Sequence, residues 1–183
     1  MRIISGKFKG KFIIAPNRLP VRPTTDFAKT GLFNILANYF DFEELSVLDL
    51  FCGTGNISYE FGSRGYSKLV AVDENNHVSK FVGETFQKLG MNDAKMIRSD
   101  VFRFLESCKE PFDIIFADPP YELKETDVIP EIVFKKKLLN ENGWLIIEHQ
   151  SKRLLQSTIE PDEIRKYGNC AFSIYKNKNL VIG

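Results

Sequence analysis

The chain has 183 residues, of which 43% are hydrophobic and 27% charged, a composition typical of one soluble globular domain with a substantial core. No apolar run approaches the ~18 residues of a membrane-spanning helix, and the opening MRIISGKFKGKF contains no apolar signal-peptide core. The three cysteines are widely spaced and form no CxxC pair. This disfavours a disulfide framework or a zinc site and predicts a cytoplasmic protein.

The formal net charge of +1 hides an uneven distribution. Residues 1–30 carry seven basic side chains and one acidic side chain, whereas residues 31–151 have a net charge of −8 and residues 152–183 of +3. A basic N-terminal segment on an acidic body predicts contact with a polyanion. Charge alone is equally compatible with a solvated edge of the protein, so both interpretations stay open at this point.

The chain begins with a predicted hairpin, a connector and a helix. Residues 1–14 alternate around two glycines, a pattern typical of a basic β-hairpin. Residues 15–25, APNRLPVRPTT, are rich in proline and predict an irregular connector. A helix with an apolar face follows, and Thr25 or Asp26 can cap it.

From Ser46 onward, short apolar strands alternate with helical patterns. The predicted strands are 46–51, 68–73, 94–98, 112–117, 143–148, 165–169 and 172–177, and the predicted helices between them are 56–64, 75–89, 100–108 and 126–137. The pattern predicts a doubly wound α/β sheet with helices on both faces and an antiparallel strand pair at its C-terminal end. We therefore expect a basic arm over residues 1–25 and an α/β domain over residues 26–183.

The first strand runs directly into a glycine-rich turn, LDLFCGTGN (48–56). Ligands of open α/β sheets bind beyond the carboxyl ends of the strands, and Gly53 and Gly55 let the backbone approach a ligand closely. Ser58 stands where a dinucleotide-binding fingerprint would have its third glycine, and no GK[ST] follows as in a P-loop. The turn therefore predicts a ligand site that is not built around a diphosphate.

Acidic residues lie within or after the first three strands. Asp73 ends the second strand 20 residues after Gly53, where a carboxylate can accept both hydroxyls of a ribose. Asp100 follows the third strand, where it either caps the next helix or also accepts from an adenine amino group. Together with Asp49, these acids favour a nucleoside-bearing cofactor with a cationic centre over a phosphate-rich one.

The order of these motifs, VLDLFCGTGN, VAVDEN, SDV and then ADPPY, resembles the class I S-adenosylmethionine (SAM) methyltransferases over residues 46–148. The resemblance implies a Rossmann-like sheet, SAM as the cofactor and no metal. It places the glycine turn at the methionine and ribose of SAM, Asp73 at the ribose hydroxyls and Asp100 at the adenine. The implied cofactor-binding residues are Asp49, Phe51, Gly53, Gly55, Asn56, Asp73, Glu74, Asp100 and Val101.

The stretch FADPPYELK (116–124) then has a chemical interpretation. The exocyclic amine of a nucleobase is a poor nucleophile because its lone pair is delocalised into the ring. The Asp118 carboxylate and the Pro119 carbonyl can accept its two hydrogens and direct the lone pair at the methyl group of SAM. Pro120 stiffens the loop, and Tyr121 offers a flat face to a base taken out of its stack. We predict that these four residues are catalytic.

Nearly the whole chain resembles a narrower family. MRIISGKFKGKFIIAP, RPTTD (22–26) and LFNIL (32–36) ahead of the glycine turn are similar to the RsmD-type 16S ribosomal RNA (guanine-N2) methyltransferases, although Phe27 and Thr30 replace residues that are often charged there. The resemblance implies methylation of a guanine N2 amine in small-subunit rRNA, within an assembled or partly assembled subunit. It makes the arm an RNA-binding element. The candidate RNA contacts are Arg2, Lys7, Lys9, Lys11, Arg22, Thr24 and Thr25.

Other functions stay open on the sequence alone. A DNA adenine-N6 methyltransferase also uses DPPY, but it usually carries a sizeable target-recognition domain, for which this chain has no room. A protein glutamine methyltransferase normally has Asn at the position of Asp118. A non-catalytic RNA-binding assembly factor could keep the fold, but it would not need the acceptor geometry of DPPY.

Overall fold

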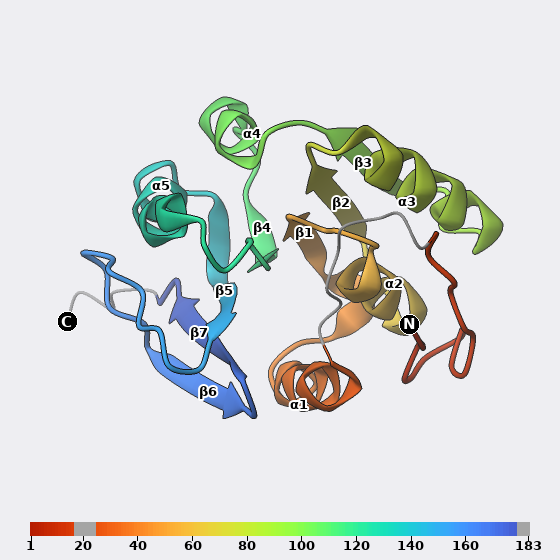
Figure 1. Cartoon of the computed structure of the whole chain (residues 1–183), viewed down its shortest axis with the longest axis horizontal. Coiled ribbons are helices and arrows are strands. Elements are labelled where there is room, and N and C mark those ends of the chain that lie inside the picture. The colour runs from red at the N-terminus through yellow and green to blue at the C-terminus, as the bar shows by residue number, and fades with distance from the viewer. Residues whose placement is uncertain (17–24, 179–183) are drawn as a thin grey trace.

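The computed structural model describes residues 1–16 and 25–178, and within these residues seven strands form one sheet (Figure 1). The strands are β1 (Ser46–Leu50), β2 (Lys68–Asp73), β3 (Ala94–Arg98), β4 (Phe112–Ala117), β5 (Leu139–Gln150), β6 (Glu163–Tyr167) and β7 (Cys170–Lys176). The helices are α1 (Asp26–Leu36), α2 (Asn56–Arg64), α3 (Asn76–Lys88), α4 (Val101–Ser107) and α5 (Ile129–Lys135), with 3-10 turns η1 (Phe42–Glu44) and η2 (Lys124–Val128).

The strand order is β3-β2-β1-β4-β5-β7-β6. Strands β1 to β5 pair in parallel, whereas β7 is antiparallel to both β5 and β6. The chain builds outward from β1 in one direction and then from β4 in the other, so the carboxyl ends of β1 and β4 meet at the switch point where such sheets bind ligands. The predicted doubly wound α/β sheet with a C-terminal antiparallel pair is confirmed.

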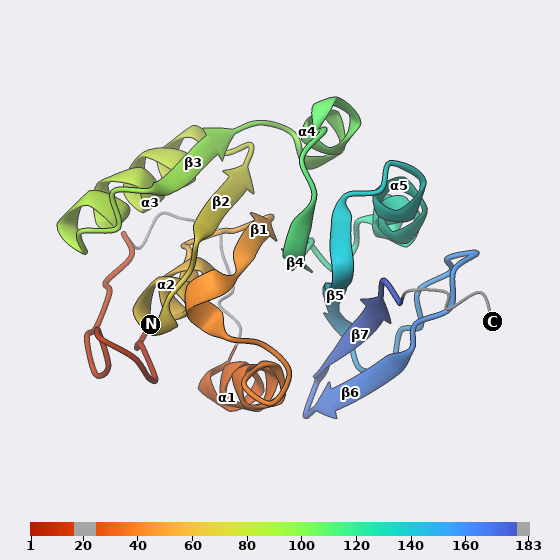
Figure 2. The ribbon, with the colours of Figure 1, turned by 180° about the vertical axis from the view of Figure 1, so that it is seen from behind.

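Helices cover both faces of the sheet (Figures 1 and 2). Helices α1, α2 and α3 bury side chains such as Leu32 and Phe86 in one core, and α4 and α5 bury side chains such as Leu105 in the other. Because side chains alternate along a strand, Val47 of β1 belongs to the first core and its neighbour Leu48 to the second. Across residues 1–16 and 25–178, no helix combines the length and the apolar character that a membrane crossing requires.

The N-terminal arm, residues 1–16, folds back on itself and lies along α2 (Figure 1). A bridge between Arg2 and Phe12 and a 3.0 Å hydrogen bond from the Ile3 N–H to the Lys11 carbonyl hold its antiparallel return. The apolar side chains of the arm belong to the core of α1, α2 and α3, and they are Ile3, Phe8 and Ile13. The arm is therefore a folded layer on the α/β domain, and its tertiary contacts fix its position.

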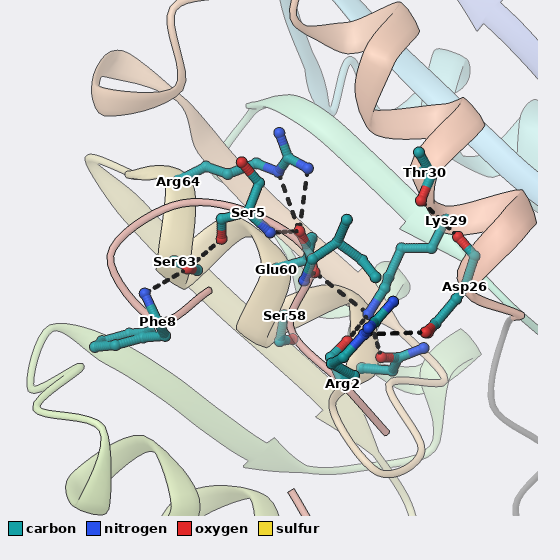
Figure 3. A network of polar contacts seen from close by, with 12 residues as sticks. Arg2, Ser5, Phe8, Asp26, Lys29, Thr30, Ser58, Glu60, Ser63 and Arg64 are labelled. Carbon is teal, nitrogen blue, oxygen red and sulfur yellow. Dashed lines mark hydrogen bonds and ion pairs between the residues drawn. The ribbon is translucent and has the colours of Figure 1, made fainter. Parts of the chain in front are cut away.

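A buried carboxylate fastens the arm to α2 (Figure 3). Glu60 has no exposed surface, and its two oxygens accept hydrogen bonds from the backbone N–H groups of Ile4 and Ser5 at 3.0 and 3.1 Å. Arg64, one turn further along α2, forms an ion pair with Glu60 at 3.1 Å. A buried charge is stable only when it is paired and hydrogen-bonded, and Glu60 meets both conditions.

Lys29 of α1 extends this network to the glycine turn (Figure 3). Its ammonium lies 3.3 Å from Glu60 and donates hydrogen bonds to the Arg2 carbonyl at 2.7 Å and to the Asn56 Oδ1 at 2.8 Å. Burial lowers the pKa of Lys29 below its ordinary value, more than the neighbouring Glu60 raises it. Lys29 is one of the seven basic residues in residues 1–30, but its charge is buried and paired with Glu60, so it adds nothing to the basic surface.

Candidate functional site

A cavity of about 730 Å³ lies at the carboxyl ends of the central strands, between the glycine turn and the loop that follows β4. This volume is within the usual range of cofactor and small-molecule sites, roughly 300–1,000 Å³. The predicted site residues in its wall are Asp49, Phe51, Gly53, Asn56, Asp73, Glu74, Asp100, Val101, Asp118, Pro119, Pro120, Tyr121 and Thr25. The fold therefore brings residues from four strand ends and from the first turn of α1 to one place.

The glycine turn departs from ordinary backbone geometry. Phe51, Gly53 and Gly55 have φ values of 56°, 51° and 81°, in the left-handed region. This conformation is strained for Phe51, and backbone strain of this kind is common at ligand sites. Gly55 is the N-cap of α2, and a Cβ there would lie 2.6 Å from the ring of Tyr59. Gly55 does not line the cavity and starts α2, so its contact with the cofactor stays a prediction.

Asp49 is fully buried in β1 and lines the cavity. Its Oδ2 accepts hydrogen bonds from the Ser58 hydroxyl at 2.5 Å and from the Ser58 N–H at 3.1 Å. Burial raises the pKa of Asp49 to about 7, because desolvation outweighs the hydrogen bonds from Ser58. A cationic ligand in the cavity would favour the ionised carboxylate.

Asp73 ends β2 with a carboxylate that the backbone holds in place. Its Oδ2 accepts from the Gly53 N–H at 3.1 Å, and its Oδ1 accepts from the Asn75 N–H at 2.9 Å. Desolvation raises the pKa of Asp73, and both backbone hydrogen bonds oppose that shift. A carboxylate oxygen has two lone pairs, so each oxygen retains an acceptor position for a ligand hydroxyl.

Asp100 caps a helix and also lines the cavity. Its Oδ1 accepts a hydrogen bond from the Arg103 N–H at 2.8 Å, so the residue caps α4. The same residue lines the cavity together with Val101. The cap is thus established, and the contact with adenine stays a prediction.

The loop after β4 carries the four predicted catalytic residues. The Asp118 N–H donates to the Leu50 carbonyl at 3.4 Å, which joins the start of the loop to the end of β1. Arg153 holds the far side, since its guanidinium donates to the Tyr121 carbonyl at 2.8 Å and to the Asp127 carboxylate at 3.0 Å. Arg153 therefore positions the loop, although no sequence motif marked it.

The first turn of α1 forms another part of the wall. Thr25 caps the helix by accepting from the Ala28 N–H at 3.2 Å, and it lines the cavity. Phe27 also lines the cavity, with 71% of its surface exposed. The Thr30 hydroxyl donates to the Asp26 carbonyl at 2.7 Å, so this side chain is tied to its own helix.

Sequence reasoning missed two further parts of the wall. Glu148 of β5 is 4% exposed, and it follows the pair Ala117–Ile147 in the register of β4 and β5, level with Asp118. The turn between β6 and β7, residues 167–170, reaches the cavity from the antiparallel edge of the sheet. The acid that ends the apolar run GWLIIE could have indicated Glu148, whereas nothing local indicated the turn.

The basic residues of the arm lie outside the cavity wall. The predicted RNA contacts that the structure describes there are Arg2, Lys7, Lys9 and Lys11, and all four are exposed. The ammonium groups of Lys7 and Lys11 lie 4.8 and 5.1 Å from the centre of the Phe8 ring. Arg22 and Thr24, which were also predicted to contact RNA, lie outside the described residues.

Comparison with known proteins identifies the family. The family described as "Conserved hypothetical protein 95" matches residues 1–176. The chain belongs to this family. "Putative rRNA methyltransferase YlbH" of Bacillus subtilis (strain 168) is 31% identical over 185 residues, which cover 97% of this chain and 100% of that protein. "Ribosomal RNA small subunit methyltransferase D" of Escherichia coli (strain K12) is 30% identical over 148 residues, which cover 81% of this chain and 71% of that protein.

These relatives confirm the predicted membership of the RsmD type, and the chain is a methyltransferase. A solved structure, "Putative methyltransferase yhhF from Escherichia coli", superimposes with a TM-score of 0.82 at 24% sequence identity. The superposition covers 97% of this chain and 98% of that one. The superposition therefore confirms the predicted Rossmann-like methyltransferase fold over nearly the whole chain.

Proposed function

We propose that this RsmD-type chain transfers a methyl group from SAM to the N2 amine of a guanine in small-subunit ribosomal RNA. The family supplies the reaction class, and its named relatives act on ribosomal RNA. The observation that carries the proposal is a single cavity lined both by the acids that suit a cationic nucleoside and by the DPPY loop. That arrangement brings a methyl donor and an amine acceptor within reach of each other.

The acids and the strained turn support SAM as the methyl donor. SAM carries a sulfonium and an ammonium group, and Asp49 offers a buried carboxylate whose ionised form a cation would stabilise. Asp73 offers two fixed acceptor oxygens to the ribose hydroxyls. Phe51, Gly53 and Asn56 also line the cavity and would hold the methionine end of SAM, and Glu74, Asp100 and Val101 would hold its adenosine end.

The DPPY loop supplies the acceptors for the amine. The Asp118 carboxylate and the Pro119 carbonyl accept the two N2 hydrogens, which localises the lone pair on nitrogen and directs it at the methyl carbon. A carbon–nitrogen bond forms as the carbon–sulfur bond breaks, so the sulfonium leaves as a neutral thioether. The nitrogen then releases one proton to solvent water. This displacement needs no metal and no covalent intermediate with the protein.

The basic arm supports an RNA substrate. Arg2, Lys7, Lys9 and Lys11 give the N-terminal arm, residues 1–16, exposed positive charges that can contact phosphates. The catalytic domain would span residues 26–183. Such contacts add affinity without reading sequence, so the shape of an assembled or partly assembled small subunit selects the guanine. We place the reaction in the cytoplasm, where the cysteine usage predicts a reducing environment.

The test of this function is methyl transfer from labelled SAM to small subunits that lack the modification, with nuclease mapping of the labelled nucleotide. The parent protein should label N2 of a single guanine in the small-subunit RNA. Asp118→Ala should retain SAM binding in calorimetry and lose transfer. Label on an adenine or on protein, or calorimetry that shows no SAM binding, would contradict the proposal.

The contribution of the arm can be measured separately. Reversing the charges of Lys7, Lys9 and Lys11 should weaken binding to the subunit and flatten the dependence of the binding constant on salt concentration. The matched control reverses three exposed lysines of α3 and β3, which are Lys80, Lys88 and Lys95. Equal effects of the two triple variants would remove the arm from the RNA interface.

A further inference from the structure

A row of four aromatic rings runs from the interior of the sheet to the rim of the cavity. Successive ring centres are 6.2 Å apart for Phe116 and Phe172, 5.6 Å for Phe172 and Tyr167, and 5.8 Å for Tyr167 and Phe27. Phe116 is 1% exposed and Phe172 is fully buried, whereas Phe27 is 71% exposed. The inner end of the row therefore lies on β4, two residues before Asp118, and the outer end faces solvent.

The ring of Tyr167 occupies space that only a glycine leaves open. Tyr167 ends β6, and α1 lies beside β6 in both views (Figures 1 and 2). A Cβ on Gly31 of α1 would lie 2.1 Å from the Cε1 atom of Tyr167. Glycine is unfavourable inside a helix, so its presence here has a packing reason. Gly31 allows Tyr167 to pack against α1 and to support Phe27.

Exposure of Phe27 would mean little by itself, because single apolar side chains are common on protein surfaces. Two further observations distinguish this ring. Phe27 and Tyr167 both line the cavity that contains the DPPY loop. Their planes meet at 75°, an edge-to-face contact that restrains the ring of Phe27 before any ligand binds. A restrained aromatic ring at the rim of a site for a flipped nucleobase is suited to stacking with a second base.

We propose that Phe27, supported by Tyr167, is a stacking platform for a nucleotide that flanks the target guanine. The inference rests on the proposed RNA substrate and deepens it. The target base has to reach Asp118 and Tyr121 in the cavity wall, and Phe27 lines the same cavity but is largely exposed, so a neighbouring nucleotide can lie against it. Stacking accepts any base and involves no charge, which separates this contact from the phosphate contacts of the arm.

The test compares methyl transfer to small subunits by the parent protein and by variants of Phe27. Phe27→Ala should raise the KM for the subunit by about 5- to 150-fold, which corresponds to stacking of about 1–3 kcal/mol per base. The kcat and the affinity for SAM should stay unchanged. Tyr39→Ala is the matched control, because Tyr39 is an exposed aromatic residue, 62% accessible, outside the cavity wall.

Phe27→Trp gives a direct readout of stacking. This variant should keep the parent KM, and RNA should quench its new indole emission. The parent protein has one tryptophan, Trp144, which is 4% exposed. Emission of the parent protein therefore serves as the background to subtract. Gly31→Ala should displace Tyr167 and raise the KM for the subunit, but less than Phe27→Ala does. Unfolding curves of all the variants would check that they fold.

The outcomes separate the platform from the proposed function. A parent protein without transfer activity would overturn the function itself. An active parent with a KM for Phe27→Ala within about twofold of its own, or equal to that of Tyr39→Ala, would overturn only the platform. A loss of SAM affinity in Phe27→Ala would also overturn it, because the ring would then belong to the cofactor site.

Discussion

Removal of the Lys29 ammonium tests whether the buried network holds the arm, α1 and α2 together. Lys29→Met keeps the apolar stem of the side chain and removes the charge. Three partners lose a contact, namely Glu60 at 3.3 Å, the Arg2 carbonyl at 2.7 Å and the Asn56 Oδ1 at 2.8 Å. The Lys29 and Glu60 side chains are 1% and 0% exposed, so water cannot easily replace the lost contacts.

Removing one partner of a buried ion pair typically lowers the free energy of unfolding by about 3–5 kcal/mol. Two features place Lys29→Met at the lower end of that range. Burial already disfavours the charged form of Lys29, and Glu60 keeps its ion pair with Arg64 at 3.1 Å. We expect a loss of about 3 kcal/mol and a fall in Tm of about 6–12 °C. Glu60→Gln leaves two cations without their carboxylate and should cost about 4–5 kcal/mol.

The assay is urea and thermal unfolding of the parent, both single variants and the double variant. Because both substitutions break the same pair, the double variant should lose less stability than the sum of the singles, by about 2 kcal/mol. Arg165→Met is the control, since Arg165 forms an ion pair with Glu163 on the surface and should leave the unfolding midpoint nearly unchanged. A loss below about 1 kcal/mol for Lys29→Met, or strictly additive losses, would refute the reasoning.

Three further predictions concern the cavity. Burial raises the pKa of Asp49 from 3.8 to about 7, so between these pH values the folded state holds a proton that the unfolded chain releases. The free energy of unfolding should therefore fall as pH rises from about 4 to about 7, by at most about 4 kcal/mol, and stay level at higher pH. Asp49→Asn should remove this pH dependence, which denaturant unfolding at several pH values would measure. The same pH dependence in the parent and in the variant would contradict the prediction. Asp73→Asn should raise the Kd for SAM by about 10- to 100-fold in calorimetry, because a charged acceptor is lost; an unchanged Kd would remove Asp73 from the ribose site. Arg153→Met should release the Tyr121 carbonyl and lower kcat by about 10- to 100-fold without a change in SAM affinity. Lys152→Met is the control, because Lys152 is the exposed neighbour of Arg153, and it should leave kcat unchanged. Parent-level kcat in Arg153→Met would show that the loop holds its position without this contact.

Local sequence was sufficient where the physical cause is also local. The predicted strands 68–73, 94–98 and 112–117 and the helix 56–64 have the bounds that the structure shows. Caps at Thr25 and Asp100 follow from side chains that bond to the backbone three residues ahead.

Two predicted elements differ markedly in their bounds, one because of a proline and the other because of strand pairing. The predicted helix 126–137 is divided into η2 and the shorter α5, which begins at Ile129 just ahead of Pro130, because proline lacks an N–H and favours the first turn of a helix. The predicted strand 143–148 extends to Leu139–Gln150, since pairing with β4 and β7 continues beyond its apolar run.

The sequence by itself determined the α/β class, the order of the motifs and the acids at the strand ends. These features depend on short-range periodicity, on glycine geometry and on the rule that parallel strands end at one edge of a sheet. Only the tertiary structure decided that Lys29 lies in the interior beside Glu60, that Glu148 stands level with Asp118, and that Tyr167 supports Phe27. Each of these pairs is distant along the chain, and which side chains meet depends on the strand order and on the helix that packs against each face.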